Sequence, residues 1–245
     1  MKRGIVFALG AAALALSRLC AAGPADYVYT PAVEYGEREI DFKAGRANTH
    51  DADQQSAASI GLGYGATPYW FTEFYSKYES AGAGGAHFDA WEWENKFQLT
   101  QTGQYPVDVG FVVEIERPQD HDEGYEVRFG PLFQTDFGRV QLNGNLLFGR
   151  QYRAAVGEPL QFGYQWQVKY RWRQALEFGL QGFGDVGAWN DWAPADQQSH
   201  RFGPAVFGKL PVGVHKAIRY NAALLLKASS GAPNTTFRMQ IEYEF

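Results

Sequence analysis

The last ten residues of the chain alternate between apolar and polar side chains without a break. The two sets are Phe237, Met239, Ile241, Tyr243 and Phe245 on one side, and Arg238, Gln240, Glu242 and Glu244 on the other. A β-strand points successive side chains to opposite faces, so the segment predicts a strand with one apolar and one charged face. A helix would scatter both sets around its axis, so the alternation excludes an amphipathic helix.

The same alternation recurs along most of the sequence. Its clearest examples are residues 107–116 and 161–172. Further runs lie near residues 69–79, 87–99, 125–134, 139–149, 176–186, 201–210, 218–227 and 236–245, with weaker ones near 33–44 and 58–64. The runs predict about twelve strands. The facing of the run 33–44 is ambiguous, because its acidic residues share a face with Val33 and Tyr35.

The predicted links between these strands alternate in length. The short links are residues 65–67, 100–105, 135–138, 173–174 and 211–216, and the longer, polar or glycine-rich links are 46–54, 80–85, 118–123, 151–158, 186–198 and 229–234. Short turns at one end and longer loops at the other are typical of transmembrane barrels. The sequence therefore predicts an all-β fold: a closed, antiparallel, up-and-down transmembrane β-barrel. An even strand number would place both termini in the periplasm.

The first 22 residues have the features of a signal peptide. A basic start, Met1-Lys2-Arg3, precedes an apolar stretch over residues 4–16, and Cys20-Ala21-Ala22 offers small residues before Gly23. The apolar stretch is too short for a comfortable membrane helix. Arg18-Leu19 departs from a lipobox, so we do not expect lipidation. We expect cleavage before Gly23, which removes the single cysteine and leaves residues 23–245 as one barrel domain without a disulfide.

Charge and composition exclude several other classes of protein. The net charge is −5 and no basic cluster is present, which argues against nucleic-acid binding. After the signal peptide, no segment approaches the eighteen or so apolar residues of a membrane helix. No motif points to a cofactor.

These features together resemble the outer-membrane β-barrel proteins of Gram-negative bacteria, without matching a characterised family. The resemblance rests on the terminal strand, the signal peptide and the strand rhythm. It implies a place in the bacterial outer membrane, among outer-membrane lipids. A terminal strand that closes on Phe looks like the signal that the barrel-assembly machinery reads, which assigns Tyr243 and Phe245 to assembly.

The cost of burying charge in lipid predicts which face points inward. A charge on the lipid face near mid-bilayer costs roughly 2–4 kcal/mol, so the polar faces should line the lumen. The predicted acidic lining residues are Glu73, Glu92, Glu94, Asp108, Glu114, Glu116 and Glu126. The predicted basic lining residues are Arg139, Lys169, Arg171, Arg201, Lys209, Arg219, Lys227 and Arg238. One wall is thus expected to be acidic and the facing wall basic.

Two arrangements of these charges remain open. The walls could face a wet pore and set up a field across it, or the charges could meet as ion pairs that plug the lumen. Twelve strands lie between the eight that side chains fill and the sixteen to eighteen that leave a channel. We favour a narrow channel for small polar or ionic solutes. The alternatives are a lipid-modifying enzyme of the outer leaflet and a closed structural or adhesive barrel.

Residues with catalytic or metal-binding potential are few. His87 and His200 lie near outer strand ends, with Ser80 and Ser199 nearby in sequence, but no motif of the outer-membrane hydrolases matches. The loop stretches 50–53 and 120–123 contain acidic residues and histidine that could hold a metal ion. Such clusters in polar loops are usually solvated. We therefore predict neither a catalytic site nor a metal site.

Overall fold

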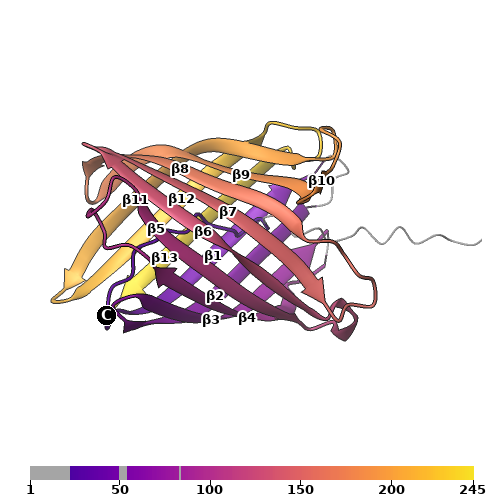
Figure 1. Ribbon diagram of the computed structural model, residues 1–245, viewed down its shortest axis with the longest axis horizontal. Helices are drawn as coiled ribbons and strands as arrows, with labels where there is room; N and C mark the ends of the chain where they lie inside the picture. Colours follow the sequence, from indigo (N-terminus) through magenta and orange to yellow (C-terminus); the bar gives the residue numbers. More distant parts are fainter. Residues whose placement is uncertain (1–22, 50–53, 83) are drawn as a thin grey trace, which may run out of the picture.

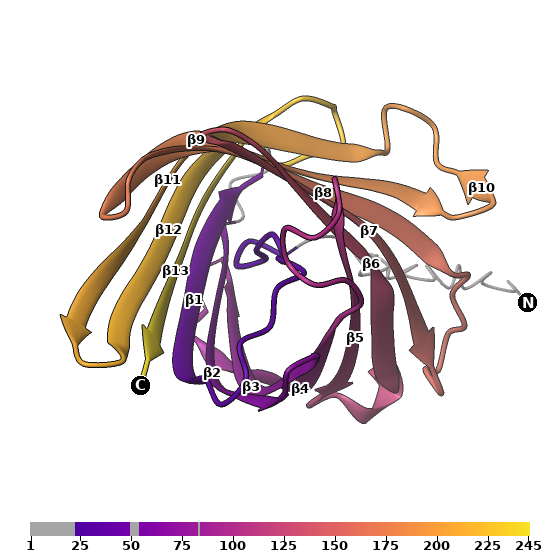
Figure 2. The same ribbon diagram turned by 60° about the vertical axis from the view of Figure 1, so that its left-hand side comes forward.

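The protein is a closed β-barrel. The computed structural model describes residues 23–49, 54–82 and 84–245, so the predicted signal peptide lies outside the described residues. Twelve antiparallel strands form the wall, and a short strand, β10, extends the β9 edge of one loop (Figures 1 and 2). Sequential strands pair with each other around the ring, and β1 pairs with β13 to close it.

The strand bounds follow the predicted runs closely. They are β1 Arg38–Asn48, β2 Gln54–Thr67, β3 Trp70–Ala81, β4 His87–Gln98, β5 Asp108–Pro118, β6 Tyr125–Phe137, β7 Val140–Tyr152, β8 Gln161–Arg173, β9 Leu176–Ala188, β10 Asp191–Trp192, β11 Ser199–Gly213, β12 Lys216–Lys227 and β13 Thr235–Glu244. The prediction of a closed antiparallel barrel of about twelve strands is confirmed.

The first predicted strand was placed too early. The expected run 33–44 is replaced by β1, which begins at Arg38. A turn at Tyr35–Gly36 interrupts the run, and Gly36 has a φ of +80°, a conformation that favours glycine. The turn resolves the ambiguous facing, since Asp41 and Lys43 of β1 are buried whereas Val33 and Tyr35 precede the strand.

The links alternate in length as expected except between β4 and β5, where the predicted short link 100–105 is instead residues 99–107 and is longer than most links at the opposite end. At one end of the barrel the strands are joined by two-residue turns, which are residues 68–69, 138–139, 174–175 and 214–215. The link 99–107 lies at the same end. Residues 119–124, 153–160, 189–198 and 228–234 form longer loops at the other end. The C-terminus lies at the short-turn end, opposite β10 (Figure 1). Within the described residues, no helix has the length and apolar character needed to cross a membrane.

The polarity of the barrel is inverted relative to a soluble protein. Large apolar side chains on the outside remain exposed, for example Leu62 at 66% and Phe74 at 50%. Charged side chains on the inside are buried, for example Glu114 at 2% and Arg238 at 1%. Monomeric soluble proteins rarely expose large contiguous apolar surfaces, whereas a barrel surrounded by hydrocarbon requires one.

The two faces of β5 provide a test of this polarity. Val113 points outward near the middle of β5, between inward-facing Val112 and Glu114. We expect Val113→Arg to destabilise the inserted barrel by roughly 2–4 kcal/mol, because it places a charge on the lipid face near mid-bilayer. The measurement is the fraction that refolds into lipid vesicles, read as heat-modifiable mobility on gels. Val107→Arg, just before β5, is the control and should cost about 0–1 kcal/mol, as near the interfaces.

The C-terminus provides a second test. The Phe245 backbone N–H donates to the Arg38 carbonyl at 2.9 Å, and its ring stacks on Tyr243 with centroids 5.7 Å apart. Phe245 is half-exposed and follows the last strand residue, so its loss removes little of the finished wall. We expect deletion of Phe245 to lower the amount inserted in cells while the purified barrel unfolds as before. Phe237→Ala, which truncates an outward ring within β13, is the control, and equal insertion of the deletion variant and the wild type would contradict an assembly role.

Candidate functional site in the barrel lumen

A segment of the chain that is not part of the wall lies inside the barrel. Residues 23–37 precede β1 and run between the walls (Figure 2). Tyr29, in its middle, is 1% exposed. At one end the Gly23 carbonyl accepts a hydrogen bond from Arg201 at 3.0 Å, and at the other the Val33 N–H donates to Gln98 at 2.7 Å. We call residues 23–37 the lumen segment.

Two tyrosines attach the lumen segment to the acidic wall. The Tyr27 hydroxyl donates to Glu94 Oε2 at 2.6 Å, and the Tyr29 hydroxyl donates to Glu114. Burial raises the pKa of both hydroxyls well above the usual range, so they are neutral donors. The Lys43 ammonium lies 3.6 Å from the centroid of the Tyr27 ring, a cation–π contact. The segment therefore supplies donors to carboxylates that the barrel has buried.

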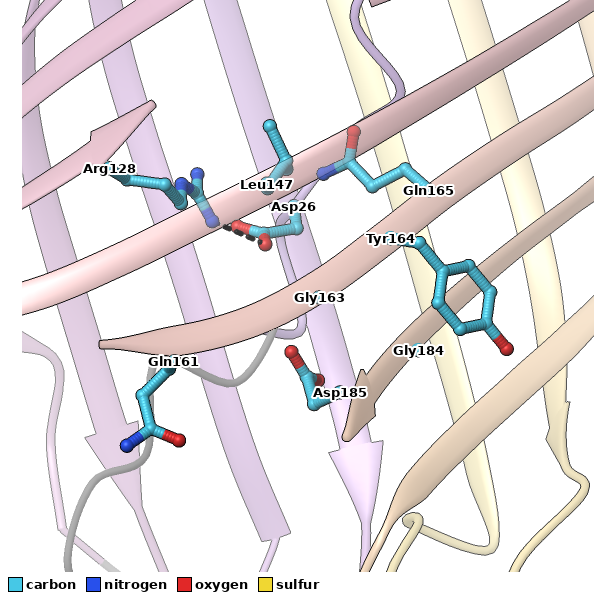
Figure 3. A pocket seen from close by; sticks show the side chains of 9 residues that line it. All are labelled: Asp26, Arg128, Leu147, Gln161, Gly163, Tyr164, Gln165, Gly184 and Asp185. Atoms are coloured by element: carbon cyan, nitrogen blue, oxygen red, sulfur yellow. Dashed lines mark hydrogen bonds and ion pairs between the residues drawn. The ribbon is translucent and has the colours of Figure 1, made fainter. Parts of the chain in front are cut away.

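An aspartate adds an ion pair to this attachment. The Asp26 carboxylate lies 3.0 Å from Arg128 Nη1, as Figure 3 shows. The same guanidinium donates to the Tyr29 hydroxyl at 2.9 Å and pairs with Glu114 through Nε. Arg128 thus joins the acidic wall to the lumen segment at two positions.

The opposite side of the segment packs against apolar and small side chains. Val28 contacts a buried cluster from β9, β11 and β12: Phe183, Ala205, Phe207, Ala223 and Leu225. Tyr29 packs instead against Val112, Leu132 and Leu147 of β5, β6 and β7. Gly45 in β1 makes room as well, because a Cβ there would collide with the Pro24 carbonyl. The extended segment therefore alternates its contacts between the two walls.

Five of the seven predicted acidic residues are buried, and three of the seven, Glu92, Glu114 and Glu116, pair with a base of the same wall. Lys77 lies 2.9 Å from Glu92 and also pairs with Glu116. Glu73, opposite Glu94 on the neighbouring strand, is buried with no hydrogen-bond partner at Oε1. Carboxylate oxygens of Glu92, Glu94 and Glu114 all lie within 4.8 Å of one another. The two remaining members have other surroundings: Asp108 accepts from the Gly103 N–H at 2.8 Å in the β4–β5 link, and Glu126 is half-buried near the start of β6.

Four of the eight predicted basic residues pair with a carboxylate of another strand or of the lumen segment. The pairs are Lys169–Glu177 at 3.3 Å, Arg171–Asp136 at 3.1 Å, Lys209–Glu244 at 2.7 Å and Arg219–Glu37 at 3.7 Å, with Arg219 also contacting Glu244. The charges therefore meet along the walls, and the segment occupies the space that was expected to separate them.

Two predicted basic residues do not lie in the interior. Arg139 is exposed in the two-residue turn between β6 and β7, so the prediction that it lines the lumen was wrong. The turn is tight because Gly138 takes a φ of +60°. The alternation of inward and outward side chains ends at this turn. Lys227 is the last residue of β12 and is exposed at the rim rather than in the interior.

Arg201 and Arg238 are more deeply buried than the other inward-facing predicted bases. Both are buried, at 5% and 1% exposure. Arg201 donates to the Gly23 carbonyl and lies 3.4 Å from Thr236 Oγ1. Arg238 donates from Nη1 to Gln181 at 2.7 Å, while its Nε and Nη2 atoms have no hydrogen-bond partner.

Small cavities border the lumen segment. One has about 20 Å³ available to the centres of water molecules and is lined by Asp26, Arg128, Gln165 and Asp185 among others (Figure 3). The second has about 40 Å³ and lies beside Tyr27, Lys43 and Glu92. Each has room for one or a few waters. The lumen is therefore occupied in this conformation.

The arrangement around the histidines offers no serine–histidine pair in the described part of the chain. His200 faces outward, with Nδ1 2.9 Å from the Tyr164 hydroxyl and Nε2 2.9 Å from Gln198 Oε1. Ser229 contacts the His200 backbone N–H and not its ring. His87 is exposed, and Ser80 donates to the Gly84 carbonyl instead.

The two loop stretches considered as possible metal ligands, residues 50–53 and 120–123, have different outcomes. Residues 50–53 lie outside the described residues. In the stretch 120–123, Asp120 accepts from the Asp122 N–H at 2.9 Å and caps the short 3₁₀ helix His121–Glu123. Its side chain therefore has a local structural role.

Solved structures with the same fold are outer-membrane β-barrels. An outer membrane channel from Pseudomonas putida F1 has a TM-score of 0.58 at 12% identity, covering 89% of this chain and 98% of that chain. The KdgM porin has a TM-score of 0.55 at 8% identity, covering 84% and 99%. The translocator domain of the autotransporter NalP from Neisseria meningitidis has a TM-score of 0.53 at 9% identity, covering 86% and 88%. No protein-family model and no curated protein matches the sequence. At these identities the likeness shows the fold.

The tyrosine attachment provides a test. In Tyr29→Phe, the hydrogen bond to Glu114 is lost while the ring packing is kept. Hydrogen bonds to charged groups contribute about 1.5–3 kcal/mol, so we expect faster amide hydrogen exchange in residues 24–30, by about tenfold or more. Exchange in the strands should not change. Tyr35→Phe is the matched control, because Tyr35 is exposed in the same segment. Equal exchange in both variants would show that Tyr29 does not hold the segment.

Proposed function

We propose that this protein is an outer-membrane channel for small polar or ionic solutes, closed in this conformation by the lumen segment. One observation carries the proposal. The walls enclose a space wide enough for an extended polypeptide chain and line it with buried charged and amide side chains. A space that admits a polypeptide backbone admits a small hydrated solute once the backbone is withdrawn.

The strand number supports this reading. The interior of an eight-stranded barrel is filled by its own side chains, whereas barrels of sixteen to eighteen strands leave a channel. Here the wall opposite the tyrosines contributes small residues, including Gly45, Ala205 and Ala223, and the lumen segment fills the room they leave. A barrel built only for rigidity would need no such space.

The outer surface and the fold support the location. Exposed apolar side chains on the strands provide the surface that hydrocarbon requires, and the solved relatives include an outer membrane channel and a porin. Outer-membrane lipids and the barrel-assembly machinery would then be the protein's partners, with Tyr243 and Phe245 as the assembly signal.

A closed structural or adhesive barrel is the second candidate. It is favoured by the number of contacts that hold the segment: two tyrosine hydrogen bonds, the Asp26–Arg128 ion pair and the Arg201 hydrogen bond to Gly23. In that case the segment would be a permanent part of the core, and only the loops would have a function.

Conductance in planar bilayers separates the two candidates. We expect the full-length barrel to give small or infrequent currents, and a variant lacking residues 24–30 to give larger and steadier ones. The deletion removes Asp26, Tyr27 and Tyr29 and leaves every strand intact. Tyr35→Phe should behave as the wild type. A deletion variant that inserts, shows heat-modifiable mobility and carries no current would contradict the channel and favour the closed barrel.

A further inference from the structure

Arg238 has hydrogen-bonding capacity that the barrel does not use. Its side chain is among the most buried in the structure, at 1% exposure, yet only Nη1 has a partner, Gln181. Nε and Nη2 are buried without an acceptor. A buried cation whose donors are unsatisfied is costly, because it has lost its hydration without replacement.

Other inward-facing bases of the lumen have carboxylate partners, unlike Arg238. Lys77, Lys169 and Lys209 each lie within ion-pair distance of a glutamate on another strand. Among the described residues, no carboxylate lies within ion-pair distance of Arg238. A guanidinium in this state is suited to bind an oxyanion, since its planar fork matches two oxygen atoms at once.

The tip of the lumen segment covers this part of the wall. The Gly23 carbonyl accepts from Arg201, and Pro24 packs against Gly45, which is the register partner of Arg238 on β1. Asp26 follows and pairs with Arg128 at 3.0 Å. The segment thus brings one carboxylate to Arg128 and one carbonyl to Arg201, and its tip packs beside the register partner of Arg238.

We propose that Arg128, Arg201 and Arg238 form a binding site for a small oxyanion, a carboxylate or phosphate, in which Asp26 is an internal substitute for the ligand. A solute anion that enters the lumen competes with Asp26 and the Gly23 carbonyl for the guanidinium groups. Its binding displaces the tip and favours the open channel. The gating consequence rests on the proposed channel function, whereas the binding site itself does not.

The cluster of carboxylates on the acidic side is already supplied with hydrogen-bond donors. Glu92, Glu94 and Glu114 lie close together, but Lys77 pairs with Glu92 and Tyr27 donates to Glu94. Glu114 accepts from both Tyr29 and Arg128. These three carboxylates therefore have donors in the closed conformation.

Calorimetric titration of the full-length, refolded barrel in detergent with inorganic phosphate, and separately with acetate, tests the site. We expect Asp26→Asn to bind phosphate about tenfold more tightly, because it removes the carboxylate that competes with phosphate for the guanidinium groups. A tenfold change corresponds to about 1.4 kcal/mol, the order of the Coulomb energy between two charges a few ångströms apart. Asp26 lies outside the barrel wall, so the variant should fold. Asp136→Asn is the matched control: it removes a carboxylate from the exposed Arg171 pair and should leave the affinity unchanged.

The arginine variants complete the test. Arg238→Gln should abolish the heat of phosphate binding. Arg238→Lys should weaken binding, because it keeps the charge and loses the planar, bidentate guanidinium. If neither folds, as judged by gel mobility, Asp26→Asn decides alone. An affinity that Asp26→Asn leaves unchanged, or an absence of binding in the wild type and Asp26→Asn alike, would overturn the site whatever the conductance. Binding without any current from the segment deletion would leave the site standing and reject the channel.

Discussion

The pairing of β1 with β13 is the constraint on which the rest of this structure depends. In hydrocarbon every backbone donor and acceptor needs a partner within the protein, and only a helix or a closed sheet provides it. Ten register pairs, from Glu39–Glu244 to Asn48–Thr235, close the ring here. Closure also fixes which side chains face lipid. Because strand side chains alternate, each apolar residue turned outward obliges its neighbour to turn inward, and the charges of the sequence collect in the lumen.

A lumen that collects charge must neutralise it without bulk water. The walls do this locally, through pairs between neighbouring strands such as Lys77–Glu92 and Lys169–Glu177. Such pairs regain part of the desolvation cost but require close geometry. Where the acids outnumber the nearby bases, at Glu94 and Glu114, the lumen segment supplies tyrosine hydroxyls. The segment is therefore part of the electrostatic balance of the barrel as well as an obstacle in it.

The wall was predictable from the sequence, and the contents of the lumen were not. Alternation identified the strands because one buried and one lipid-facing set repeat with period two, as in residues 107–116. It failed at residues 33–37, where Val33 and Tyr35 imitate a strand before the Gly36 turn. The lumen segment has no strand partner to reveal it. Tyr27 and Tyr29 reach carboxylates 67 and 85 residues away, and sequence spacing contains no signal for such contacts. The rim positions of Arg139 and Lys227 depend on where each strand ends, which the alternation does not fix.

The attachment of the lumen segment is asymmetric, and this asymmetry links its structure to its proposed movement. The hydrogen bonds of Tyr27 and Tyr29 go to β4, β5 and β6, and the Tyr29 carbonyl also accepts one from Asn145 of β7. The facing wall contributes Val28 packing against small and aromatic side chains, and it leaves Arg238 unsatisfied. Withdrawal of the segment therefore costs several hydrogen bonds on one wall and the Arg201–Gly23 hydrogen bond on the other, where it also uncovers the unsatisfied Arg238. Gly36, with its positive φ, lies where the segment joins β1 and offers a position at which the backbone direction can change while the β1–β13 pairing stays intact. A lumen closed by such a segment is sensitive to any solute that supplies Arg238 with the acceptors it lacks.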